Sequence, residues 1–154
     1  MEMRASAASG TPGRGSALPA MWGGLALTIV ATVYPLVDAA TTQVLADHIR
    51  ATYPAYDAGE VSAAVTAYLV ILSVAGALGV LFWLGTMWAV RGRKKWAPWA
   101  ASTAWLAAVS FAVCGLTVKD DSGEVGLAPP LAWLQVPPCA LGLVAVVLLW
   151  RRSR

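Results

Sequence analysis

Four long apolar segments restrict what this chain can fold into more than any other feature of its sequence. They cover residues 21–40, 61–90, 96–118 and 127–150. A helix needs about 20 residues, at about 1.5 Å per residue, to cross a hydrocarbon core of about 30 Å, and each segment is that long. Lipid offers no partners to backbone N–H and C=O groups, and continuous rather than alternating apolar residues indicate helices instead of barrel strands. The sequence therefore predicts an all-α membrane protein, an antiparallel bundle of four transmembrane helices.

The overall composition also indicates a multi-pass protein of the cell membrane. Of the 154 residues, 58% are apolar and only 12% are charged, whereas soluble domains carry about 25% charged residues. The mean hydropathy is +0.66, and the length corresponds to one domain. The lipid bilayer is thus the first partner that the sequence predicts.

The basic residues gather on one side of the predicted bundle. They are Arg4, Arg14, Arg91, Arg93, Lys94, Lys95, Arg151, Arg152 and Arg154. The positive-inside rule makes this side cytoplasmic, so both termini are expected inside (N-in/C-in). The residues expected to determine this topology flank the membrane helices directly: Arg91, Arg93, Lys94, Lys95, Arg151 and Arg152. These clusters could also hold anionic lipid headgroups, and the net charge of +3 requires no nucleic-acid partner.

The predicted organisation consists of a membrane domain between two tails. Residues 1–19 are rich in Gly, Ser and Pro and are expected to form a disordered cytoplasmic tail. Residues 20–150 form the membrane domain, and residues 151–154 a basic cytoplasmic tail. The expected helices cover about 20–52, 57–90, 96–118 and 127–150. A cleaved leader ending near residue 40 is the alternative to a retained first helix.

The connection between the first two apolar segments has helical spacing of its own. No helix breaker stands between Ala40 and Thr52, so the first helix is expected to continue out of the membrane until Pro54 stops it. Asp57 and Glu60 form a capping-box pattern at the start of the next helix. The alternative lays residues 41–52 flat on the membrane surface as an amphipathic helix.

The fourth segment contains two adjacent prolines in "AWLQVPPCALGL", which predict a kink or break. Pro137 and Pro138 cannot donate backbone hydrogen bonds, and freed carbonyls in lipid need other partners. Three interpretations remain open: a structural kink, a break that lines a ligand path or gate, and a segment that does not cross completely. With the deepest acid of the first helix, these residues form the candidate polar membrane site: Asp38, Gln135, Pro137, Pro138 and Cys139.

The small residues Ser73, Gly76 and Gly79 recur along the second apolar segment. Small side chains let membrane helices approach closely. They are expected to face another helix of the same chain, and a second copy of the chain is the alternative.

The sequence shows no motif for catalysis, for a cofactor or for a metal. It lacks H-E-x-x-H, G-x-S-x-G and the phosphate-binding G-x-x-x-x-G-K-[ST] patterns, and His48 is its one histidine. The expected role is non-enzymatic: an accessory or interaction protein that binds a second copy or another membrane protein. The alternative is a small oligomeric transporter or channel, with a polar path lined by Asp38, Gln135, Thr103 and Ser110.

One pattern in the chain resembles a known group of proteins. The stretch "YPAYDAGEV", a long apolar helix and then "RGRKKWAPW" before another helix resemble small uncharacterised four-helix membrane proteins of high-GC Gram-positive bacteria. The resemblance covers residues 21–150. It implies a fold and a membrane location, and it carries over no activity and no functional residues.

Overall fold

The computed structural model describes residues 17–119 and 123–153, with side chains up to Arg151. Six helices follow one another: α1 (Ala17–Ala40), α2 (Val44–Thr52), α3 (Ala58–Arg91), α4 (Ala97–Thr117), α5 (Pro129–Trp133) and α6 (Val136–Ser153). In the described ranges the regular elements are all helices, apart from an isolated bridge between Lys119 and Val125. The prediction of an all-α fold is confirmed.

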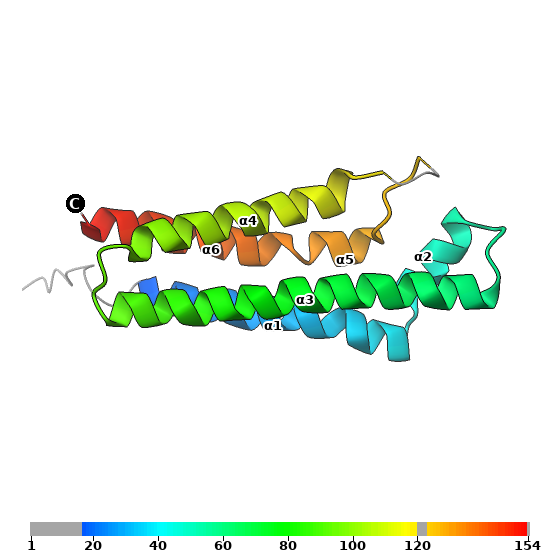
Figure 1. The fold of residues 1–154 in the computed structure, drawn as a ribbon, viewed down its shortest axis with the longest axis horizontal. Helices are drawn as coiled ribbons and strands as arrows, with labels where there is room; N and C mark the ends of the chain where they lie inside the picture. Colours follow the sequence, from blue (N-terminus) through cyan, green and yellow to red (C-terminus); the bar gives the residue numbers. More distant parts are fainter. Residues whose placement is uncertain (1–16, 120–122, 154) are drawn as a thin grey trace, which may run out of the picture.

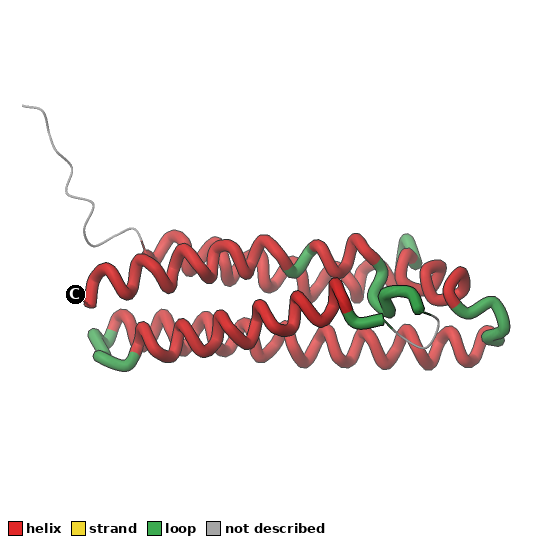
Figure 2. Tube along the Cα trace, turned by 90° about the horizontal axis from the view of Figure 1, so that it is seen from above, coloured by secondary structure: helices red, strands yellow, loops and turns green. Residues whose placement is uncertain are grey.

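The long helices lie side by side along one axis, and successive ones run in opposite directions (Figures 1 and 2). α1 packs closely against α3 and α6, and α4 packs against α6. α3 and α4 are joined by a short turn but contact each other far less. The bundle therefore has one loosely packed seam, between α3 and α4.

Most of the apolar surface of these helices is not covered by protein. In the most apolar stretch of α3 only 6% of the residues are buried, and in that of α4 only 11% are buried. Large apolar side chains such as Leu81 and Trp88 are 63% and 64% exposed. Exposing such area to water would cost about 25 cal/mol per Å², a cost that lipid removes. In the part of the chain that the structure describes, four helical segments, the fourth formed by α5 and α6 together, are long and apolar enough to cross a membrane. This supports the prediction of a membrane protein.

The first helix differs from the prediction at both of its ends. It begins at Ala17, so residues 17–19 are helical, and the rest of the predicted tail lies outside the described residues. It stops at Ala40 instead of continuing to Thr52, because residues 41–43 form a turn in which Gln43 has a φ of 53°. The expected single helix over 20–52 is wrong.

α2 packs on protein at one end of the bundle, which is called the capped end from here on. Its side chains Leu45 and Ile49 are buried with Val61 of α3 and Leu131 of α5. α2 therefore neither extends α1 nor buries its apolar face in lipid as the flat alternative requires. Figure 1 shows it against the far end of α3.

α3 begins as the sequence predicts. The backbone N–H of Glu60 donates to Asp57 Oδ1 at 2.8 Å, and the N–H of Asp57 donates to Glu60 Oε2 at 2.9 Å. The helix contains 34 residues, or about 50 Å at 1.5 Å per residue. It is longer than a bilayer core, and α2 packs against its first turns.

The small residues of α3 face α1. A Cβ atom added at Gly79 would lie 3.0 Å from Thr28 Cγ2, and one at Gly76 would overlap the side chain of Thr32. Of the two interpretations of these small residues, the structure shows packing against another helix of the same chain.

The fourth segment is broken, as its prolines predict. Leu134 and Gln135 form a turn between α5 and α6. The break lies just before the prolines, so Pro137 and Pro138 fall in the first turn of α6. There their missing N–H groups remove no hydrogen bond from within α6.

Candidate functional site

A cavity of about 280 Å³ lies inside the bundle, between α1, α3, α4 and α6. Its lining on α3 runs from Leu72 to Thr86, a distance of about 21 Å along the helix. All four membrane-length helices contribute side chains, so the cavity exists only in the folded bundle.

Two tryptophans form opposite walls of this cavity. Trp83 of α3 donates from Nε1 to Thr28 Oγ1 on α1 at 3.0 Å. Its ring lies against Gly24, where any Cβ would overlap it. These contacts hold the Trp83 indole against α1 and out of the central space.

The second tryptophan is Trp105 of α4. Its Nε1 donates to the carbonyl oxygen of Cys139 on α6 at 2.9 Å. A Cβ at Gly142 would lie 2.8 Å from Trp105 Cδ1. One indole is thus drawn to α1 and the other to α6, and the volume between α3 and α4 stays open.

The threonine hydroxyls of the walls form hydrogen bonds within their own helices. The hydroxyls of Thr28, Thr32 and Thr86 donate to backbone carbonyls one turn earlier, at 2.7–2.8 Å. Gln135 differs from them. Its half-buried side chain lines the cavity near the capped end, and its amide forms no hydrogen bond to any residue that the structure describes.

The structure brings only part of the predicted polar site together. Gln135, Pro138 and Cys139 line the cavity. Pro137 is exposed and turned away from it. Both cysteines are free thiols, so Cys139 is not paired with Cys114.

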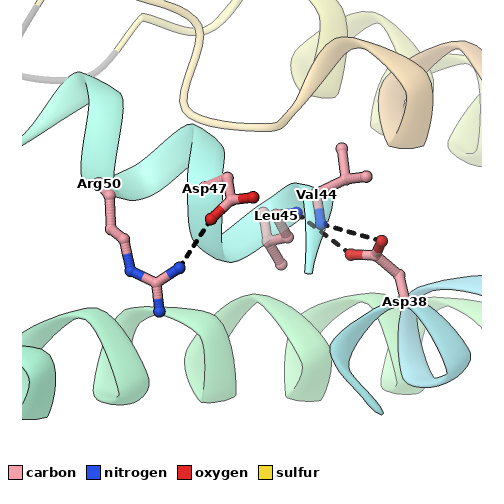
Figure 3. Close-up of polar contacts among 5 residues, drawn as sticks. All are labelled: Asp38, Val44, Leu45, Asp47 and Arg50. Carbon is pink, nitrogen blue, oxygen red and sulfur yellow. Dashed lines mark hydrogen bonds and ion pairs between the residues drawn. The ribbon is translucent and has the colours of Figure 1, made fainter. Parts of the chain in front are cut away.

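Asp38 has a separate place in the fold. Its carboxylate accepts hydrogen bonds from the backbone N–H groups of Val44 and Leu45, at 3.0 and 3.1 Å (Figure 3). It also accepts a hydrogen bond from the Thr42 hydroxyl. The residue is 1% exposed. A carboxylate at this position satisfies N–H groups that the first turn of a helix cannot pair itself. Asp38 is therefore the cap of α2 and lies outside the cavity.

Both ends of the cavity are closed by packed side chains. The cluster around Leu45, Leu72 and Leu131 closes the capped end. At the other end, Met21, Met87 and Ala145 pack together, and Ala17, Ala101 and Leu149 pack beside them. The cavity is not a channel through the bundle.

The end opposite to α2 carries the predicted basic residues and is called the basic end. Arg91 ends α3, and Arg93, Lys94 and Lys95 lie in the turn between α3 and α4. Arg151 lies near the end of α6, whereas the Arg152 side chain is outside the described residues. Lys94 Nζ lies 5.8 Å from the centre of the Trp88 ring. Trp150 donates to Ser102 Oγ at 3.0 Å and packs edge-on against Trp99. Tryptophan is enriched where membrane helices meet the interface, and Trp88, Trp99 and Trp150 are called the aromatic belt from here on.

The acidic residues near His48 do not assemble a metal site. His48 Nε2 donates to the carbonyl oxygen of Val125 at 3.0 Å. Among the residues that the structure describes, no three His, Cys, Asp or Glu side chains lie close enough to hold a metal ion. This hydrogen bond from His48 instead links α2 to the segment that precedes α5.

The place of the two cavity tryptophans was not predicted from the sequence. A signal was available, because Trp83 and Trp105 lie more than one turn inside their apolar segments, away from the belt. An indole N–H at that depth needs a partner, since lipid supplies none. The sequence does not say which helix provides it.

No family model, curated protein or solved structure matches this chain.

Proposed function

We propose that this chain is a multi-pass protein of the cell membrane, with both termini in the cytoplasm, that serves as a non-enzymatic accessory or interaction protein. The capped end is its interaction surface. The observation that carries this proposal is α2, which is folded onto the bundle and adds a structured surface beyond the membrane helices. On α2, Asp47 and Arg50 are paired at 2.7 Å and are both exposed (Figure 3).

The same geometry argues against the transporter alternative for a single chain. A solute path needs polar groups that follow one another across the membrane. Asp38 is used as a helix cap, Gln135 lines a cavity that is closed at both ends of the bundle, and Thr103 and Ser110 are on the exposed side of α4. A path would have to form between copies.

The orientation is tested by cysteine labelling in a background with Cys114→Ala and Cys139→Ala. Tyr56→Cys, at the capped end, should react with a membrane-impermeant maleimide on intact cells, because the basic residues assign the opposite end to the cytoplasm. Lys94→Cys should react only after the cells are permeabilised. Labelling of Lys94→Cys from outside would overturn the proposed topology.

The accessory role is tested by site-specific crosslinking on cells. A photoreactive residue in place of Arg50 should yield one adduct of defined mass, and the same residue in place of the lipid-facing Leu81 should not. Purified protein in liposomes should leave a proton gradient intact. A flux that disappears in both Asp38→Asn and Gln135→Ala would instead support the transporter.

A further inference from the structure

The cavity opens sideways, at membrane depth, through the seam between α3 and α4. Four of its lining residues are exposed: Leu78 and Phe82 on α3, which are 51% and 52% exposed, and Ala107 and Ala108 on α4. The other lining residues are buried or half-buried. A group that enters through this opening comes from the hydrocarbon region of the bilayer.

The shape of the cavity restricts what can enter it. Its 280 Å³ is spread along α3 from Leu72 to Thr86, over about 21 Å. A second helix, about 10 Å across with its side chains, cannot fit into so narrow a space. A single extended hydrocarbon chain can.

The chemistry of the lining gives the occupant a direction. The hydroxyl and indole groups of the walls are already paired within the protein. Gln135 provides the free polar group, 15 residues before Trp150, or about 22 Å from the aromatic belt. In a core of about 30 Å this places Gln135 about 8 Å below the opposite interface, on the side from which the ester groups of a lipid in the seam would approach it.

We propose that the seam between α3 and α4 binds one acyl chain of a glycerolipid, with the Gln135 amide donating a hydrogen bond to an ester carbonyl of that lipid. The acyl chain lies against the walls formed by Trp83 and Trp105, and the small alanine side chains of α4 leave room for it. This inference goes beyond the proposed accessory role and rests only on insertion of the protein into a bilayer.

Lipid retention by the purified full-length chain tests the cavity. After exchange into palmitoyl-oleoyl phosphatidylcholine, native mass spectrometry should show one retained lipid per chain. Ala108→Trp places an indole in the opening and should reduce retention at least about tenfold, the equivalent of about 1.4 kcal/mol. Ala77→Trp is the matched control, because Ala77 is exposed on α3 and does not line the cavity. Equal retention by both variants would overturn the proposal.

A second comparison tests the role of Gln135 and requires no change in cavity size at the opening. The wild-type chain should retain the ester lipid about three- to tenfold better than its ether-linked analogue, because the ether lacks the carbonyl acceptor. Gln135→Leu should retain both equally. Equal retention of the ester and ether lipids by the wild type would contradict the proposed hydrogen bond from Gln135.

The test of the lipid site can fail independently of the test of the proposed function. If Tyr56→Cys and Lys94→Cys label as expected but no lipid is retained, only the lipid site fails. A disulfide between two Ala108→Cys copies in the membrane would show that a second copy covers the opening, and the lipid site would be rejected.

Discussion

Gly76→Ala is expected to lower the free energy of unfolding by about 1–3 kcal/mol, the usual cost of overpacking a closely packed contact. The added Cβ would lie 2.7 Å from Thr32 Cβ and would overlap the rest of that side chain. Because Thr32 Cβ is fixed to the backbone of α1, the two helices must move apart. The loss outweighs the gain in helix propensity of about 0.5–1 kcal/mol. The free energy of unfolding is measured in mild detergent by adding a denaturing detergent and recording the circular dichroism.

Gly85 provides the matched control on the same helix. A Cβ at this position meets no atom within 4 Å, so Gly85→Ala should be neutral or stabilising by up to about 1 kcal/mol. Thr32→Ala combined with Gly76→Ala removes two of the three overlapping atoms and should restore part of the loss. Equal stabilities for the two single alanine variants would contradict the packing of α1 against α3.

Asp38→Leu is expected to destabilise the capped end by about 2–3 kcal/mol. The substitution removes the acceptor of three hydrogen bonds and leaves the Val44 and Leu45 N–H groups without partners. Asp38→Asn keeps one acceptor oxygen and should lose less. Hydrogen exchange of the Val44 and Leu45 amides and tryptic cleavage after Arg50 should both become faster.

The control for Asp38 is Asp47→Asn, which removes an exposed ion pair on the same short helix. Such pairs contribute between about 0 and 1 kcal/mol, so exchange of the Val44 and Leu45 amides should stay close to that of the wild type. Unchanged protection in Asp38→Leu would show that α2 is held by its apolar face alone.

Parts of this fold were predictable because they depend on neighbours in the chain. The apolar runs predict four membrane-length helices, and the Asp57 and Glu60 pair predicts where α3 begins. The prolines predict the broken fourth segment. The end of α1 was not predictable from helix breakers, because its turn is stabilised by the Asp38 carboxylate and by burial of Leu45 and Ile49 against α3 and α5.

The candidate site was predictable only in part. Gln135 and Cys139 were singled out by their depth and by the prolines, and they do line the cavity. Asp38 was singled out for the same reason, although its carboxylate belongs to a helix cap. Depth along a helix indicates that a polar group needs a partner, but it does not identify the partner.

The sequence by itself determined the all-helical character, the four apolar helices and the separation of basic from acidic residues, because hydropathy and charge act over one segment at a time. Only the tertiary structure decided that Trp83 turns to α1 and Trp105 to α6, which leaves a cavity in the seam between α3 and α4. Those choices depend on Gly24 and Gly142, far away in the chain, where the missing side chains make room for the rings.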